Sequence, residues 1–331
     1  MVARNDRLGD ALMALPSLLS LRMAYPELAI DFFCREAVLP ALRSWLLKNQ
    51  IEGITSWPQG GLRKAYNGIL FLFSDTDLMY EAWREWIGVR VGIYSRPASF
   101  LLLNGGIIQH RSRAAKNEAE YNLDLTELFA KKLFGERKLT LPPKISLPEN
   151  RWESERVAAW LGDAGVEGDF VVVHPGMGGS ALNASVETYV RLVRSLLEAG
   201  RRVVLSQGPA PLDAELAATL TERISGLVRF FGLTLQETAE LFRRSCLVVA
   251  PATGPLHLAH YVGVETLGIF SPVRAQHRDR WAPWGGTGKV NVLVPSVECP
   301  GLKACWGERC ENYLCLDQLR PENLILPELP A

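Results

Sequence analysis

The stretch "VVAPATGPLHLAHYVGVETLGIFSP" (residues 248 to 272) decides the fold, because it passes from a strand to a helix and back to a strand. Two apolar runs, Leu247 to Ala250 and Thr266 to Phe270, flank a short helical segment from Pro255 to Tyr261. Strands joined through a helix pair in parallel and carry helices on their faces. The stretch therefore predicts an α/β protein built on a parallel sheet.

The same alternation continues through the rest of the C-terminal half. Further strands are predicted at Phe170 to His174, Arg202 to Ser206 and Leu227 to Phe231. The helices between them are predicted at Val186 to Leu197, Ala214 to Ile224 and Leu235 to Arg243. The N-terminal half is less regular, with strands expected at Val2 to Asn5, Ala29 to Cys34 and Gly68 to Phe73 and a helix starting near Gly9. Each half is predicted to be a doubly wound unit.

A proline-rich segment, "LPPKISLPEN" (141 to 150), separates the two halves. Its prolines cannot lie inside a helix and favour an extended connector. We place the domain boundary there, giving domains 1–150 and 151–331. The last segment, "LDQLRPENLILPELPA" (316 to 331), is expected to form one short helical piece and then coil that packs back on the N-terminal domain.

Composition narrows the class of protein. The chain has 331 residues, 48% of them hydrophobic, with 36 acidic and 36 basic side chains. This neutral balance argues against nucleic acid as a partner, because a nucleic-acid binder needs a surplus of positive charge. No apolar run approaches the roughly 20 residues of a membrane span, and Asp6, Asp10 and Pro16 are atypical of a signal peptide. We expect a cytoplasmic protein, with peripheral association with the inner membrane surface left open.

Four of the six cysteines lie near the end of the chain, at Cys299, Cys305, Cys310 and Cys315. Structural zinc sites usually contain close pairs of cysteines separated by two residues, and this spacing does not occur here. Local packing or an adventitious disulfide is the default interpretation, and a metal site is the less favoured one.

Three turns between a strand and a helix combine glycine with a small polar residue. In "NDRLGDALMALP" (5 to 16), Gly9 permits a sharp turn and Asp10 stands at the start of the next helix, where a capping role is the simplest interpretation. In "VVVHPGMGGSALN" (171 to 183), backbone amides could hold a phosphate, although an ordinary turn is favoured because neither standard phosphate-binding motif is present.

The third turn contains Thr253, Gly254, Pro255 and His257. Thr253 is expected to cap the helix, Pro255 suits its first position, and Gly254 lets a ligand approach the backbone. His257 then either reaches an anion or a sugar hydroxyl, or is an ordinary core histidine.

Several segments together resemble the ADP-heptose:lipopolysaccharide heptosyltransferase family, glycosyltransferase family 9. They are "RLGDALMALPSLLSLRMAYPELAIDFFC" (7 to 34), the glycine loop (171 to 183), "FFGLTLQETAELFRRSCLVVAPATGPLHLAHYVGV" (230 to 264), "FSPVRAQHRDRWAPWG" (270 to 285) and "CPGLKACWGERCENYLCL" (299 to 316). The resemblance implies a GT-B fold, in which two Rossmann-like domains face each other across a cleft. The acceptor would bind the N-terminal domain and the nucleotide sugar the C-terminal domain.

The resemblance also implies an activity and a set of site residues. It implies inverting, metal-independent transfer of a heptose or related sugar from a nucleotide diphosphate, with ADP-heptose the expected donor, to lipopolysaccharide core or another cell-envelope glycan. It makes Asp10 the catalytic base. No cofactor is expected. The implied donor-binding residues are Met177, Gly178, Gly179, Ser180, Gly232, Leu233, Thr234, Leu235, Thr253, Gly254, Pro255 and His257, with Asp213 and Glu215 competing for the ribose.

On the acceptor side, "HRSRAAKNEAEYNLDL" (110 to 125) resembles a segment in which Arg111, Arg113 and Lys116 would meet an anionic acceptor. A solvated helix face explains these charges equally well.

Two departures from the family pattern concern the donor. Ala252 stands where many relatives have aspartate or serine, and Leu182 stands where relatives often have a cation. A missing cation can cost about 2 to 4 kcal/mol of leaving-group stabilisation, unless Arg274 or Arg278 replaces it. Two other functions therefore stay open, a non-catalytic or weakly active sugar-nucleotide-binding protein and a GT-B-like sugar-nucleotide epimerase.

Overall fold

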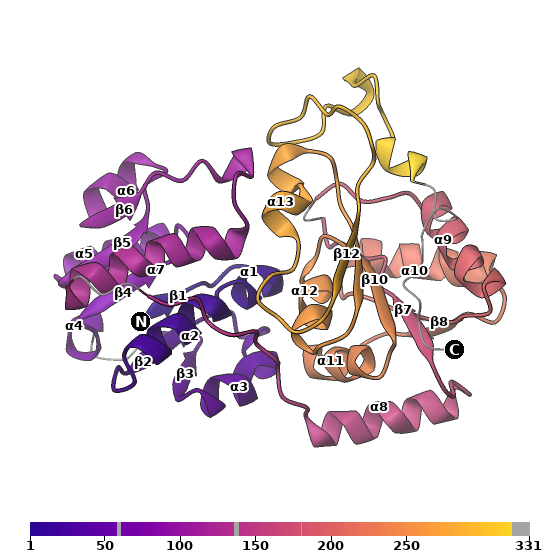
Figure 1. Cartoon of the computed structure of the whole chain (residues 1–331), viewed down its shortest axis with the longest axis horizontal. Helices are drawn as coiled ribbons and strands as arrows, with labels where there is room; N and C mark the ends of the chain where they lie inside the picture. The colour runs from indigo at the N-terminus through magenta and orange to yellow at the C-terminus, as the bar shows by residue number, and fades with distance from the viewer. Residues whose placement is uncertain (58–60, 136–138, 180, 320–331) are drawn as a thin grey trace. The chain divides into compact units, whose positions relative to one another are not determined.

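The computed structural model describes residues 1–57, 61–135, 139–179 and 181–319. The chain divides into two compact units, drawn from indigo to magenta and from pink to yellow in Figure 1. The first unit comprises Met1–Arg111 and Lys116–Leu147, and the second comprises Ser112–Ala115 and the chain from Pro148 onward. The division after Leu147 falls within the proline-rich connector. The segment expected to pack back on the N-terminal domain is residues 316–331, of which 320–331 lie outside the described residues.

The first unit contains a six-stranded parallel sheet in the order β3-β2-β1-β4-β5-β6, counted over the described residues. Its strands are β1 (Val2–Ala3), β2 (Ile30–Phe33), β3 (Ile51–Ile54), β4 (Gly68–Phe71), β5 (Val89–Ile93) and β6 (Gly105–Ile107). Its helices are α1 (Leu8–Leu12), α2 (Leu15–Ala24), α3 (Leu39–Lys48), α4 (Leu62–Ala65), α5 (Thr76–Arg84), α6 (Pro97–Leu102) and α7 (Glu118–Phe134). Helix α7 packs against β4, β5 and β6 and against α2.

The second unit repeats this plan, with the order β12-β11-β10-β7-β8-β9 over its described residues. Its strands are β7 (Phe170–Val173), β8 (Arg202–Ser206), β9 (Val228–Phe230), β10 (Leu247–Pro251), β11 (Thr266–Ile269) and β12 (Val290–Leu293). Its helices are α8 (Arg151–Asp163), α9 (Val186–Glu198), α10 (Pro211–Arg223), α11 (Leu235–Arg243), α12 (Gly254–Tyr261) and α13 (Arg278–Trp281). Short 3₁₀ helices lie at Arg111–Arg113, Arg274–Gln276, Gly307–Arg309 and Cys315–Gln318.

The α/β prediction is therefore confirmed, and the predicted strands and helices lie within a few residues of their observed positions. The largest shift is in α10, which begins at Pro211 and not at Ala214. Proline suits the first position of a helix, because its missing N–H would have no partner there. Strands β3, β5, β6 and β12 were not predicted.

The strands at the centre of each sheet are buried along their whole length: β1, β4, β7 and β10. Helix α9 covers its sheet with a buried face that includes Tyr189 and Val193. Burial of an aliphatic side chain such as Val193 contributes about 1.5 to 3 kcal/mol. Of the helices within the described ranges, none is both long and apolar enough to cross a bilayer.

The strand order reverses between β1 and β4 in the first unit and between β7 and β10 in the second. Doubly wound sheets bind ligands outside the carboxyl ends of the strands at such a reversal. The site residues of each unit are therefore expected beside its strand-order reversal.

Candidate functional site

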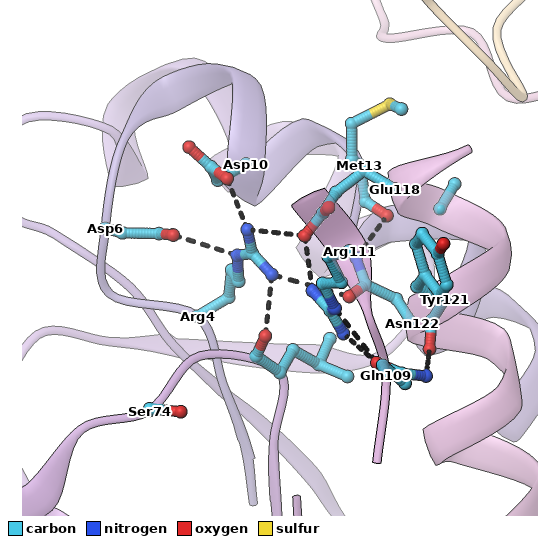
Figure 2. A network of polar contacts seen from close by, with 12 residues as sticks. Arg4, Asp6, Asp10, Met13, Ser74, Gln109, Arg111, Glu118, Tyr121 and Asn122 are labelled. Atoms are coloured by element: carbon cyan, nitrogen blue, oxygen red, sulfur yellow. Dashed lines mark hydrogen bonds and ion pairs between the residues drawn. The ribbon is translucent and has the colours of Figure 1, made fainter. Parts of the chain in front are cut away.

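In the first unit, the buried side chain of Arg4 lies at the reversal, directly after β1 (Figure 2). Only 3% of Arg4 is exposed. Its guanidinium carries five N–H groups, and each has an acceptor. The acceptors are Asp6 Oδ1 at 2.9 Å, Leu72 O at 2.6 Å, Asn122 Oδ1 at 3.4 Å, Glu118 Oε1 at 3.1 Å and Asp10 Oδ1.

This network balances the charge of a buried cation. Burial alone would lower the pKa of the Arg4 guanidinium, but the carboxylates of Asp10, Asp6 and Glu118 outweigh burial and raise that pKa. The pKa of Asp6 is raised to about 7, chiefly by burial, although Arg4 opposes the shift. Sequence reasoning missed Arg4 as a functional residue. The available signal was a charged residue immediately after a buried strand.

Asp10 lies in the first turn of α1, and 16% of its side chain is exposed. The N-cap of α1 is Arg7, and no side chain caps this helix. The capping interpretation of Asp10 is therefore wrong. Its Oδ1 accepts from Arg4 Nη2, and within the described part of the chain Oδ2 has no hydrogen-bond partner. One carboxylate oxygen is thus fixed and the other is available to a ligand.

The structure differs from the expected acceptor site at Arg111. This side chain is buried, pairs with Glu118 Oε1, donates to Gln109 Oε1 at 2.9 and 2.7 Å, and lies over the ring of Tyr121. Because its guanidinium is committed to these groups, Arg111 belongs to the Arg4 network rather than to an open acceptor surface.

The other two predicted acceptor cations have different surroundings. Lys116 is exposed and pairs with Asp124 at 2.7 Å. Arg113 is exposed, belongs by its contacts to the second unit, and its carbonyl accepts from Arg274 Nε at 2.7 Å.

In the second unit, Asp213 braces the glycine loop that follows β7. Its Oδ1 accepts from the backbone N–H groups of Met177 at 3.0 Å and Gly178 at 3.2 Å, and only 6% of the residue is exposed. A Cβ atom on Gly176 would lie 2.5 Å from this carboxyl group and one on Gly208 only 2.3 Å away. These contacts explain both glycines.

The same contacts occupy several of the groups that were predicted to bind the sugar-nucleotide donor. The N–H groups of Met177 and Gly178 are used internally, and Asp213 is committed to the loop, whereas its competitor Glu215 is exposed. Gly179 is exposed and has a left-handed backbone with φ +69°. The predicted site residue Ser180 lies outside the described residues.

At the second reversal, the start of α12 contains two buried polar atoms without partners in the described ranges: Thr253 Oγ1 and His257 Nδ1. His257 is 2% exposed, and burial, followed by the neighbouring His260, lowers its pKa to about 3. Thr253 occupies the N-cap position, but its side chain makes no capping bond, contrary to the prediction. Helix α12 also starts at Gly254, so Pro255 is its second residue.

The neighbouring His260 shows what an ordinary core histidine looks like here. Its Nδ1 lies 2.8 Å from Gly288 O, and its Nε2 accepts from Gly286 N at 2.8 Å. Buried polar atoms normally have such partners. The unpartnered atoms of Thr253 and His257 therefore favour a ligand site over simple core packing.

The predicted nucleoside segment lies between β9 and α11. Gly232 has a left-handed backbone with φ +69°, Leu233 and Leu235 are half-buried, and Thr234 caps α11. Thr234 Oγ1 accepts from Glu237 N at 3.2 Å, while Glu237 Oε2 accepts from Thr234 N at 2.8 Å. The Thr234 hydroxyl thus has a structural partner already.

Both arginines proposed as replacements for the missing cation lie next to Asp279. Leu182 N donates to Gln276 Oε1 at 3.1 Å. Arg274, one of the two proposed replacements, pairs with Asp279 at 2.9 Å, which partly neutralises it. Arg278 is half exposed and its Nε lies 3.9 Å from the same carboxylate.

The four late cysteines have unpaired thiols and line one cavity of about 220 Å³. Burial, with a further contribution from the other three thiols, raises the pKa of Cys315. In the described ranges, no group of histidine, cysteine, aspartate or glutamate side chains is arranged to hold a metal ion.

Comparison with known proteins identifies related sequences and folds. The model of glycosyltransferase family 9 (heptosyltransferase) matches residues 104–301. A Haemophilus influenzae protein, named as a candidate glycosyltransferase, is 29% identical over 321 residues, covering 89% of this chain and 88% of that protein.

Two solved E. coli structures share the fold. ADP-heptose lipopolysaccharide heptosyltransferase II has 18% identity and a TM-score of 0.67, covering 87% of this chain and 88% of that chain. A heptosyltransferase solved with ADP has 20% identity and a TM-score of 0.62, covering 91% of this chain and 93% of that chain. The prediction of a GT-B fold is confirmed by these matches.

Proposed function

Because this chain belongs to glycosyltransferase family 9, we propose that it is an inverting, metal-independent transferase that moves a heptose or related sugar from ADP-heptose to lipopolysaccharide core or another cell-envelope glycan. The observation that carries the proposal is the position of the Asp10 carboxylate. Its carboxylate stands at the strand-order reversal of the first unit, with Oδ1 held by Arg4 and Oδ2 open within the described residues.

In the proposed reaction, Asp10 Oδ2 takes the proton of an acceptor hydroxyl while the hydroxyl oxygen attacks the anomeric carbon. The bond between that carbon and the diphosphate oxygen breaks, and its electron pair stays on the departing phosphate. A single displacement inverts the anomeric centre. It needs a general base and stabilisation of the leaving charge, and no covalent enzyme intermediate.

The donor diphosphate is proposed to bind at the start of α12. Thr253 Oγ1 can donate to a phosphate oxygen, and so can His257 Nδ1 when the neutral imidazole carries its proton there. The amino end of a helix favours an anion, and Gly254 has no side chain to block its approach. The expected partner is thus a nucleotide sugar, and the E. coli relative solved with ADP supports this class.

The acceptor is proposed to be a glycan or glycolipid, which the enzyme would meet in the cytoplasm at the inner membrane surface. No further cofactor enters the proposed chemistry. Asp10 supplies the base, while the start of α12 supplies donors for the leaving group.

The test is to incubate the chain with ADP-heptose, with and without heptose-free lipopolysaccharide, and to measure ADP release. We expect release that depends on acceptor, is unchanged by EDTA, and gives a product whose anomeric configuration is opposite to that of the donor by NMR. Retained configuration, or loss of activity in EDTA that a divalent cation restores, contradicts the proposal.

A second candidate function is a sugar-nucleotide-binding protein with little or no transfer activity. Leu182 favours it, because the cation expected there is missing and Arg274 is paired with Asp279. Tight ADP-heptose binding by calorimetry, without acceptor-dependent ADP release, would select this function.

A further inference from the structure

We propose that Arg4 is the positioning residue for the Asp10 base, fixing one carboxylate oxygen so that the other faces the acceptor hydroxyl. This inference rests on the proposed function, because it assigns Arg4 a role only if Asp10 accepts a proton. Figure 2 shows Arg4 between Asp10 on one side and Glu118 and Asn122 on the other.

The first step is geometric. Arg4 satisfies all five N–H groups with five acceptors, so its guanidinium plane is held from every side. Its Nη2 donates both to Asp10 Oδ1 and to Glu118 Oε1. Lysine has the same charge but only three donors on a flexible stem, so it cannot reproduce this arrangement.

The second step is that the frame holding Arg4 is itself buried and rigid. Glu118 is fully buried at the first turn of α7, where it also pairs with Arg111. Asn122, one turn further along α7, accepts from Arg4 and donates through Nδ2 to Met13 O at 3.1 Å. Because α7 packs on β4, β5 and β6, the sheet and α7 together set the direction of the Arg4 guanidinium.

The third step concerns charge during the reaction. When Oδ2 of Asp10 takes a proton, that carboxylate becomes neutral and no longer compensates Arg4. A buried cation without a partner is costly. Glu118, whose Oε1 lies 3.1 Å from Arg4 Nη2, stays beside Arg4. The guanidinium therefore stays paired on both sides of the proton transfer, and the network around Arg4 persists when Asp10 takes the proton.

The test is Arg4→Lys in the full chain, with Arg84→Lys as the matched control. Arg84 is an exposed arginine of the same unit that pairs with Glu81 at 2.5 Å. Since a base displaced by about 1 Å can cost about 100-fold, we expect Arg4→Lys to lower kcat by about 10- to 100-fold. The KM for ADP-heptose and the Kd for ADP should stay within about twofold of wild type, because donor binding is assigned to the second unit.

If Arg4→Lys does not fold, Glu118→Gln provides the same test. It keeps an amide oxygen for both guanidiniums but loses the charge, so we expect a lower kcat with unchanged donor KM. A folded Arg4→Lys, or in its absence a folded Glu118→Gln, with wild-type kcat overturns the inference. A loss shared equally by kcat, donor affinity and melting temperature also overturns it, because that pattern indicates a purely structural role.

The inference and the proposed function can fail separately. If Asp10→Asn abolishes transfer while Arg4→Lys keeps full kcat, only the role of Arg4 is lost. If Asp10→Asn transfers sugar normally, or if the wild-type chain shows no acceptor-dependent ADP release, the proposed function fails and the role of Arg4 fails with it.

Discussion

Replacing Asp213 by alanine should loosen the glycine loop of the second unit and destabilise that unit. Asp213 Oδ1 accepts two backbone hydrogen bonds, from Met177 N at 3.0 Å and from Gly178 N at 3.2 Å. Alanine removes the shared acceptor, so both hydrogen bonds are lost at once. It also removes the carboxyl group that packs against Gly176 and Gly208.

The magnitude follows from the burial of the two donors. A hydrogen bond to a charged group contributes about 1.5 to 3 kcal/mol, and a buried donor left without an acceptor costs about 1 to 3 kcal/mol. Met177 is buried and bears this full cost, whereas Gly178 is exposed and can regain a water molecule. We therefore expect the free energy of unfolding to fall by about 2 to 4 kcal/mol. At about 2 to 4 °C per kcal/mol for a unit of this size, the melting temperature falls by roughly 4 to 16 °C.

The assay is urea unfolding together with thermal unfolding, and the matched control is Glu215→Ala. Glu215 lies two residues further along α10, is exposed and carries the same charge. Its removal should change the free energy of unfolding by less than about 0.5 kcal/mol. Equal stabilities of Asp213→Ala and Glu215→Ala would refute the assignment of Asp213 to the loop. So would an Asp213→Ala variant of wild-type stability that has lost only its affinity for the ribose of ADP.

Three further predictions concern pH and the donor site. Burial lowers the pKa of His174 to about 4 and of His257 to about 3, so as pH falls below 6.5 only the unfolded chain takes up protons at these histidines. Urea unfolding at a series of pH values should show the free energy of unfolding falling by about 1.4 kcal/mol per pH unit for each histidine. A folded His257→Asn variant with the same dependence of stability on pH as wild type would contradict this. Burial raises the pKa of Asp6 from 3.8 to about 7, so stability is lost as pH rises between these values, where Asp6 ionises in the unfolded chain but stays protonated in the folded one. Asp6→Asn should therefore melt above wild type at alkaline pH and close to wild type in acid, and the opposite order would count against the shift. Thr253→Val should weaken ADP binding about tenfold, measured by calorimetry. The control Thr219→Val should bind ADP like wild type, because the Thr219 hydroxyl bonds within its own helix to Glu215 O at 2.9 Å. Unchanged affinity in Thr253→Val would show that its hydroxyl has no role in ADP binding.

Local sequence patterns predicted the central strands well and the outer strands poorly. Strands β7 and β10 are continuous apolar runs, so their burial is visible in the sequence. Strand β6 is only "GGI", which has no local preference for a strand. Its glycines are explained by neighbours, because a Cβ on Gly105 would lie 2.5 Å from Lys132 and one on Gly106 would lie 2.8 Å from the Gly92 carbonyl. Only pairing with β5 makes this segment a strand.

The residues of the candidate site likewise differ in whether a local sequence pattern reveals them. The turn at Thr253 and Gly254 was predicted as an anion site from adjacent residues, because glycine and proline at a helix start form a local pattern. For His257 the local pattern left a core position open, and only the family resemblance implied a ligand role. Arg4 was not predicted, since its partner Glu118 lies 114 residues away and comes near it only through the packing of α7. The bracing role of Asp213 was missed for the same reason, as its loop partners lie 35 and 36 residues earlier.

The most direct test of the central claim compares acceptor-dependent ADP release by Asp10→Asn and Asp77→Asn. Both are aspartates in the first turn of a helix of the first unit, and Asp77 is exposed in α5. Loss of a general base lowers rates by about 100- to 10,000-fold, and we predict a loss of this size for Asp10→Asn, with ADP affinity unchanged and Asp77→Asn at wild-type rate. Transfer by Asp10→Asn at a rate close to that of Asp77→Asn would contradict the account.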